Sequence, residues 1–368
     1  ATDAGYKLVI VLSGMHNNLR EQTQSRLDSQ LFSGPDWYPL TTPVSDFEHP
    51  AKPSELFLHQ PALCAVVKKN ANRLEKLVAM LNDPAMKKIL PSIPVLIVDD
   101  EADQATPNSM REKEQVSTIN QLLRDLWASI TTGSYVAYTA TPFANVLMDP
   151  DNESDLFPSD FITTIQPGPG YFGAERVFGL SETVPDQPGI ATDGLDMVRE
   201  IPRAEAELLR PPSNKEERAE FDCEPPPSML HALEWFIVAT AVRRTRGQYG
   251  HSSMLVHTTH YALPHFAMKQ QLEFSIEDLR ASVRRGDLTR LTAAWQREAL
   301  AVSDQATEPL PTWPEVASAI PDVLDQVEVI VDNGASHDLL NYDEKQGRIV
   351  VAVGGGALCR GLTLEGLV

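Results

Sequence analysis

The chain has 368 residues, 42% of them hydrophobic, and a formal net charge of −20 at pH 7, so it is long enough for one large domain or two ordinary ones. No apolar run is long enough to span a bilayer, and the three cysteines are too sparse for a disulfide framework. We therefore expect a cytoplasmic protein with no membrane partner. The negative charge excludes a protein that coats DNA, although a local basic groove stays open.

Strands and helices alternate through the first part of the chain. Apolar runs predict four buried strands, and apolar residues at helical spacing predict three helices between them. This alternation implies a parallel sheet covered on both faces, with ligands at the carboxyl ends of the strands. The predicted strands are Lys7–Leu12, Ala62–Lys69, Val95–Asp100 and Ser134–Thr141, and the predicted helices are 16–31, 72–83 and 116–130.

The pattern changes from about Asp149 to Pro227, where prolines, glycines and acidic residues are frequent. We interpret this stretch as an irregular insertion or linker between two α/β lobes. The predicted domains are residues 1–150, the insertion 151–227 and the second lobe 228–368. Within the second lobe we predict helices at 228–246, within 263–302 and at 313–324, and strands at 253–259, 327–333 and 348–354.

Acidic residues follow the strand "PVLIV" directly: Asp99, Asp100, Glu101 and Asp103. Like charges this close raise each other's pKa, so a metal ion or a set of hydrogen bonds must offset the repulsion. A hydrophobic strand that ends in Asp-Glu occupies the Walker B position of P-loop NTPases, where an Asp holds Mg²⁺ and a nearby acid orients the attacking water. We predict Asp100 as the metal ligand and Asp100 and Glu101 as catalytic residues; the alternative is a solvated, purely structural junction.

Two threonines end the next strand, in "YVAYTATPFAN". The hydroxyls of Thr139 and Thr141 can bond the acids of the preceding strand or a phosphate, so we predict both as nucleotide-binding residues. An ordinary Thr-rich strand end is the alternative.

The helix after the first strand carries His16, Arg20 and Gln24 at positions i, i+4 and i+8, on one face. We name these three residues and Arg26 as candidates for contact with a DNA backbone. A solvated helix face would show the same spacing.

A glycine-rich stretch follows the last predicted strand. Gly354 and Gly356 would allow close backbone approach to a phosphate, and Arg360 and Gly361 complete the candidate contact. The alternative is a glycine-rich turn with a surface arginine.

In order along the chain, these segments resemble the motifs of superfamily two helicases. "DDEADQA" and "YTATPFAN" resemble motifs II and III, "VIVLSGMHNNLREQTQSRLD" sits where motif Ia would be, "SSMLVHTT" resembles motif IV, and "VVAVGGGALCRGLTLEGL" resembles motif V. The sequences of these motifs are most similar to those of the Z-one domain family, and the resemblance spans nearly the whole chain.

The resemblance implies an α/β fold of two RecA-like lobes with mostly parallel sheets. It implies a helicase-like, nucleic-acid-dependent ATPase with ATP and Mg²⁺ as cofactors and DNA as a partner, in a bacterial restriction or phage-defence system with possible protein partners. Thr139 and Thr141 would then couple nucleotide state to lobe closure. Members of this family are also described as endonucleases.

One departure from the pattern is the lack of any G-x-x-x-x-G-K-[ST] segment, the loop that cradles phosphates. In the family this loop would lie upstream of Ala1 and motif VI downstream of Val368, so we expect a chain truncated at both ends that hydrolyses ATP poorly or not at all. Two alternatives stay open. One is a metal-dependent DNA endonuclease using the four acids; the other is a degenerate RecA-like scaffold that binds partner proteins.

Overall fold

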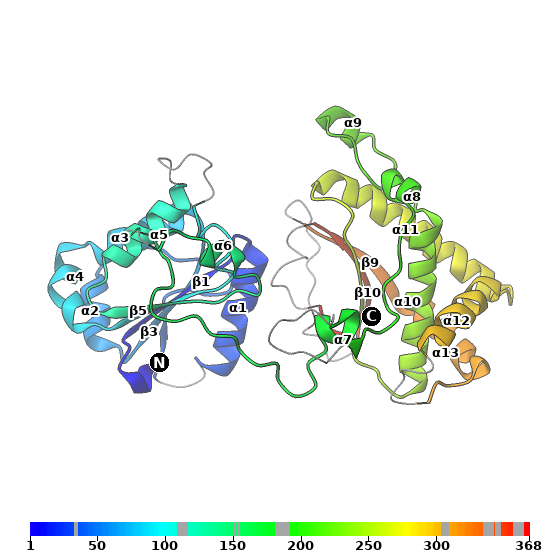
Figure 1. Ribbon diagram of the computed structural model, residues 1–368, viewed down its shortest axis with the longest axis horizontal. Helices are drawn as coiled ribbons and strands as arrows, with labels where there is room; N and C mark the ends of the chain where they lie inside the picture. Colours follow the sequence, from blue (N-terminus) through cyan, green and yellow to red (C-terminus); the bar gives the residue numbers. More distant parts are fainter. Residues whose placement is uncertain are drawn as a thin grey trace. The chain divides into compact units, whose positions relative to one another are not determined.

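Apolar strands alternate with helices along the chain, and the structure places them in two units, residues 1–164 and 165–368 (Figure 1). This computed structural model describes residues 1–32, 36–108, 117–150, 152, 155–180, 192–302, 309–333, 342, 347–355 and 364–368. Within this described part, no helix combines the length and apolarity needed to cross a lipid bilayer.

A five-stranded sheet in the order β2-β3-β1-β4-β5 forms the centre of the first unit, and every neighbouring pair is parallel. All the carboxyl ends therefore meet at one edge, where loops can assemble a binding site. The strands are β1 (Leu8–Ser13), β2 (Tyr38–Pro39), β3 (Leu63–Lys68), β4 (Val95–Asp99) and β5 (Gly133–Ala137).

Helices lie on both sides of this sheet (Figure 1). The connection from β1 to β3 runs in the opposite direction across the sheet from those that lead to β4 and β5. Because such crossovers are right-handed, α1 lies on one face and α3 and α5 on the other. The helices of this unit are α1 (Asn17–Gln30), α2 (Pro53–His59), α3 (Ala71–Leu81), α4 (Pro84–Ile89), α5 (Thr118–Ala128) and α6 (Phe143–Val146), with short 3-10 turns at Thr2–Ala4 and Leu90–Ser92.

Local sequence explains the helix ends. Asn70 caps α3 by accepting a hydrogen bond from the amide of Asn72, and Asp83 caps α4 by accepting from Ala85. The apolar face of α3, with Leu74 and Leu77 fully buried, packs on the sheet. The predicted helix at 72–83 is therefore confirmed.

Short elements occupy the described parts of the region predicted as an insertion. They are α7 (Ala174–Phe178), the two-residue antiparallel strands β6 (Gly179–Leu180) and β7 (Thr192–Asp193), α8 (Arg203–Leu208) and α9 (Lys215–Ala219).

The second unit has a three-stranded parallel sheet in the order β8-β10-β9. Helix α11 packs on β9 and β10, and one face of the sheet joins the helices in an extensive apolar core. The other face holds a small cluster in which Leu364 packs on Ile330, Val350 and Ala352. The elements are α10 (Pro227–Thr245), β8 (Ser252–Val256), α11 (Ala262–Arg284), α12 (Thr289–Val302), α13 (Trp313–Gln326), β9 (Val327–Asp332) and β10 (Ile349–Gly354).

The predicted fold class, α/β with mostly parallel sheets, is confirmed. One predicted strand is too long: β5 ends at Ala137, so Thr139 and Thr141 lie in the loop after the strand. In that loop the two threonine hydroxyls bond an aspartate of the neighbouring loop.

Candidate functional site

The loop that follows β4, here called the acidic loop (residues 99–106), lies at the carboxyl edge of the first sheet. Main-chain bonds fix its start: the amide of Asp100 donates to Leu12 O at 2.9 Å, and the amide of Tyr138 donates to Asp99 O at 2.8 Å. The amide of Ala102 then returns a bond to Tyr138 O at 3.0 Å. The loop is thereby attached to both strands that flank β4.

The side chain of Asp99 is not exposed at the carboxyl edge of the sheet. It is fully buried, and Lys69 Nζ, also fully buried, lies 2.6 Å from Asp99 Oδ1. Thr106 and Tyr135 each donate a hydroxyl hydrogen bond of 2.7 Å to Asp99 Oδ2. An internal ion pair and two hydroxyls therefore compensate this charge.

Asp103 is held by the two predicted threonines. Thr139 Oγ1 donates to Asp103 Oδ1 and Thr141 Oγ1 donates to Asp103 Oδ2, both at 2.9 Å. The amide of Thr141 also donates to Thr139 Oγ1 at 2.9 Å, which fixes the spacing of the two hydroxyls. The structure thus joins the segments quoted for motifs II and III through a bidentate contact.

Asp100 and Glu101 are partly exposed. Asp100 Oδ1 accepts from the amide of Glu101 at 3.1 Å, and Glu101 Oε2 accepts from Gln104 Nε2 at 3.1 Å. Glu101 has φ 52° and Ala105 has φ 62°, both in the left-handed region, which is strained for residues with a Cβ. Of the two carboxylate residues, Glu101 is the one with a strained backbone, and strain of this kind clusters at functional sites.

Residues that the sequence analysis did not single out hold the carbonyl groups of this loop. Lys69 donates to Glu101 O at 2.8 Å, Asn120 Nδ2 to Thr106 O at 2.6 Å, and Asn145 Nδ2 to Ala102 O at 3.0 Å. Of these three residues, only Lys69 could have been found from the sequence. It directly follows a buried strand whose carboxyl end lies at the same edge of the sheet as the acidic loop.

The four acids do not surround a common point. In the described residues no group of three His, Cys, Asp or Glu side chains is placed to hold a metal ion together. Asp99 is committed to Lys69 and Asp103 to the two threonines, so the metal site built from all four acids is not found there. Asp100 and Glu101 are the two acids that neither Lys69 nor the threonines hold.

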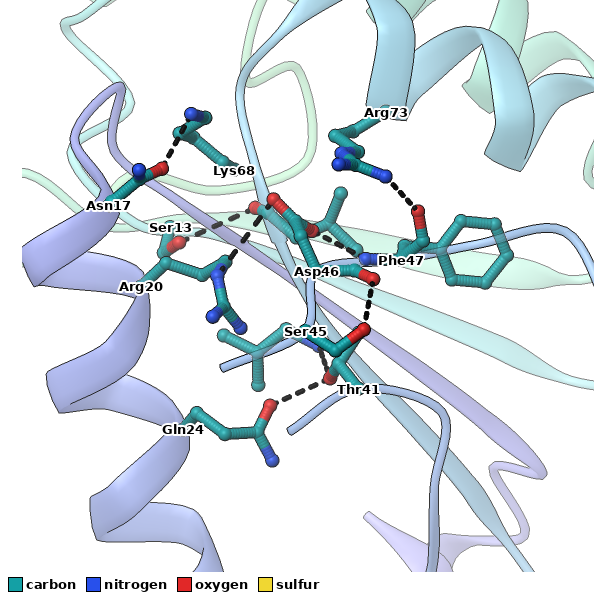
Figure 2. Close-up of polar contacts among 12 residues, drawn as sticks. Ser13, Asn17, Arg20, Gln24, Thr41, Ser45, Asp46, Phe47, Lys68 and Arg73 are labelled. Atoms are coloured by element: carbon teal, nitrogen blue, oxygen red, sulfur yellow. Dashed lines mark hydrogen bonds and ion pairs between the residues drawn. The ribbon is translucent and has the colours of Figure 1, made fainter. Parts of the chain in front are cut away.

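Two of the candidate DNA-contacting residues are buried instead. Arg20, 3% exposed, donates from Nη1 to Thr42 O at 2.9 Å and lies 3.8 Å from the Asp46 carboxylate. Gln24, fully buried, accepts a 2.7 Å hydrogen bond from Thr41 Oγ1. Figure 2 shows both side chains reaching from α1 toward the segment that carries Thr41 and Asp46.

This network has a structural purpose. Thr41 Oγ1 in turn accepts from the amide of Val66, at 2.9 Å, so it satisfies a main-chain donor of β3. Gln24 is fully buried and Arg20 is 3% exposed, so this burial disfavours their predicted contact with DNA, which stays a prediction. His16 and Arg26 are exposed, and their contact with nucleic acid stays a prediction.

The candidates near the last strand belong to the second unit. Gly354 is the buried final residue of β10, at the carboxyl edge of that sheet. Gly356, Arg360 and Gly361 lie outside the described residues. Their predicted contact with phosphate stays a prediction.

Comparison with known proteins gives one match. The family model of the Z1 (Z-one) domain matches residues 228–368. Neither the curated proteins nor the solved structures include a match to the chain. The resemblance is thus supported over the part of the second unit that this range covers, and the helicase-like and endonuclease activities stay predictions.

Proposed function

With the Z1 domain match as premise, we propose that the chain is the core of a helicase-like, nucleic-acid-dependent ATPase of a bacterial DNA-processing or phage-defence protein. The observation that carries the proposal is the bidentate contact between Asp103 and the hydroxyls of Thr139 and Thr141. It ties the acidic loop to the segment after β5. Any movement of one is passed to the other, as a nucleotide-driven machine requires.

The donor set around Asp100 and Glu101 fits Mg²⁺. This ion prefers oxygen ligands, and in nucleotide sites it is held by one or two carboxylates together with phosphates and waters. A site without three converging protein ligands is therefore compatible with it. Asp100 would hold the ion, and Mg²⁺, when bound, would compensate the charge of the phosphates.

Glu101 would orient the attacking water and accept its proton. Its carboxylate is steered by the hydrogen bond from Gln104 Nε2 at 3.1 Å, and its backbone, at a strained φ of 52°, is held by the hydrogen bond from Lys69 Nζ to Glu101 O at 2.8 Å. A water-orienting acid must be held in one position to be effective. The rigidity of the acidic loop supplies that condition.

The phosphate cradle is the missing part, because no G-x-x-x-x-G-K-[ST] segment occurs in the sequence. Without backbone amides and a lysine around the β- and γ-phosphates, the 368-residue chain is expected to hydrolyse ATP slowly or not at all. Metal-dependent turnover by this chain alone would contradict that expectation.

The test is ATP hydrolysis by the full-length gene product that contains this chain, with and without single- and double-stranded DNA. We expect DNA-stimulated turnover that Glu101→Gln lowers by about a hundredfold or more, since it removes the acid that accepts the proton. Glu75→Gln, an exposed position on α3, is the matched control and should keep wild-type rates.

No turnover under any condition would overturn the proposal. DNA cleavage without ATP that Asp100→Asn abolishes would favour the endonuclease instead. Binding of a partner protein that ignores nucleotide, metal and DNA would favour the scaffold.

A further inference from the structure

Lys69 follows β3 directly and reaches across the end of β1 to the acidic loop after β4. Its amide nitrogen lies 3.3 Å from Ser13 O and 3.2 Å from Gly14 O, which fixes its main chain beside the end of β1. Its side chain is fully buried. A lysine is rarely buried to this degree unless its charge is paired and its protons are bonded.

The ammonium group is surrounded by oxygens of the acidic loop. Nζ lies 2.6 Å from Asp99 Oδ1 and donates to Glu101 O at 2.8 Å, to Gln104 O at 3.3 Å and to Thr106 Oγ1 at 3.3 Å. Only one of these four oxygens carries a formal charge. The lysine is thus placed to organise the loop and not simply to neutralise one aspartate.

The rest of the network keeps Asp99 in place. Tyr135 donates its hydroxyl to Asp99 Oδ2 at 2.7 Å. Burial raises the pKa of Tyr135 well above its usual value, and the charge of Asp99 raises it further. The tyrosine therefore stays protonated and acts as a donor. Asp99 is held from one side by Tyr135 and Thr106 and from the other by Lys69.

The bonds from Lys69 fall where the loop is strained. Glu101 and Ala105 are the non-glycine residues with positive φ among the described residues, at 52° and 62°. The two carbonyls that Lys69 binds belong to Glu101 and to Gln104, the residue just before Ala105. A left-handed conformation persists in such residues only when the surroundings over-determine it. Charge-assisted bonds to both carbonyls provide that constraint.

We propose that Lys69 is a positioning residue for the acidic loop: its ammonium fixes the backbone of Glu101–Ala105 and so the orientation of the Asp100 and Glu101 carboxylates. The catalytic consequence rests on the proposed function. The structural part does not, because it concerns only the conformation of the loop.

The competing account is that Lys69 only neutralises Asp99. The two accounts differ for the double variant Lys69→Met/Asp99→Asn, which removes the buried ammonium and the buried carboxylate together. If Lys69 only neutralises, the double variant regains stability and loop order together. If Lys69 positions the loop, stability returns only in part, because the carbonyls of Glu101 and Gln104 stay without their donor.

The measurement is amide hydrogen exchange in the whole chain, without nucleotide, at Ala102 and Gln104. These amides donate to Tyr138 O at 3.0 Å and to Glu101 O at 2.9 Å, so they report the loop directly. In the double variant we expect the urea midpoint to return toward wild type, while exchange at both amides stays at least about tenfold faster. Wild-type exchange in the double variant would overturn the proposal.

Two further variants keep the test decisive if the double variant does not fold. Asp99→Asn alone retains the ammonium and its bonds to the carbonyls of Glu101 and Gln104. Loss of the buried counter-charge lowers the urea midpoint, but exchange at Ala102 and Gln104, compared at equal global stability, is expected to stay close to wild type. Exchange that rises as in Lys69→Met would contradict the proposal. Lys68→Met is the matched control, because Lys68 is bonded to Asn17 at 2.6 Å and not to the loop.

The proposed function can fail separately. In an active full-length protein, Lys69→Met/Asp99→Asn is expected to lower kcat at least about tenfold with a smaller change in KM for ATP, because the loop acts on the chemical step. A wild-type protein without ATPase activity would remove this second readout and the proposed function. The exchange result would still decide the role of Lys69.

Discussion

Arg20 is a charged side chain that donates hydrogen bonds to two uncharged carbonyl oxygens as well as facing a carboxylate. Its guanidinium donates to the carbonyl oxygens of Thr42 and Pro43 and approaches Asp46. A planar group with five donors suits a curved segment of backbone better than any other side chain. Arg20 therefore fastens the segment after β2 to α1, together with the hydrogen bond from Thr41 to Gln24.

Replacing Arg20 with Met tests this role. Leaving the partly buried carbonyls of Thr42 and Pro43 without their donor is expected to lower the free energy of unfolding by about 2 kcal/mol, measured by urea titration. Affinity of the full-length protein for DNA should not change. Arg26→Met, at an exposed position of the same helix, is the control and should alter stability by less than about 0.5 kcal/mol.

The opposite outcome would restore the phosphate-contact hypothesis for Arg20. In that case the variant would bind all DNA sequences more weakly, and the salt dependence of binding would fall by about one unit of slope.

Helix α11 carries a buried histidine near its beginning. His265, 1% exposed, has Nε2 3.0 Å from Thr259 O and Nδ1 3.0 Å from Asn333 Nδ2. Because the amide must donate to Nδ1, the neutral ring donates from Nε2. Burial lowers the pKa of His265 below its usual 6.5, and nearby His257 lowers it further.

A pH dependence of the second unit follows. Above pH 6.5 the residue is neutral in both states and contributes no pH slope. Below pH 6.5 the histidine binds a proton more readily in the unfolded chain than in the folded chain. The free energy of unfolding therefore decreases as the pH is lowered, by at most about 1.4 kcal/mol per pH unit. Urea titrations at about pH 7.5 and about pH 5.5 should show that the free energy of unfolding decreases less between these two values for His265→Gln than for the wild type. His231→Gln, exposed on α10, should keep the wild-type slope.

At the level of elements, the regular strands and long helices could be predicted because their apolar patterns match their burial. The run from Leu63 to Val67 is buried throughout, and β9 and β10 lie within the strands predicted for them. Elements of two to six residues between 174 and 219 could not be predicted, because they are too short to show a period.

The site was predicted in part. The acidic loop and the two threonines were expected at one edge, since parallel strands end together, and they do meet there. Burial of Arg20 and Gln24 was missed because a polar stripe looks the same whether it faces water or a loop. Lys69 was missed for a related reason: two of its four oxygen partners are main-chain carbonyls, and the sequence does not show which carbonyls a side chain will bind.

At the scale of the whole molecule, the buried apolar residues that the structure describes form separate clusters. Each buried cluster lies wholly within residues 1–164 or within 165–368. Units with separate cores behave as independent cooperative blocks. Stability is therefore a property of each unit and not of the chain.

We expect residues 1–164 and 165–368 to fold when expressed separately. Circular dichroism should show a cooperative transition for each, and calorimetry of the whole chain should show their sum. A fragment that remains unfolded alone, while the whole chain melts in a single step, would contradict this division.

The strand order has a consequence for synthesis on the ribosome. In the first unit β1 is central, and the later strands β4 and β5 are added toward one edge, so the sheet can grow as the chain emerges. In the second unit the central strand is β10, residues 349–354, although β8 and β9 are made earlier. Until β10 leaves the exit tunnel, β8 and β9 have no hydrogen-bonding partner in their sheet. The nascent second unit must keep two apolar strands apart from other chains during that interval, which is when a chaperone would matter most.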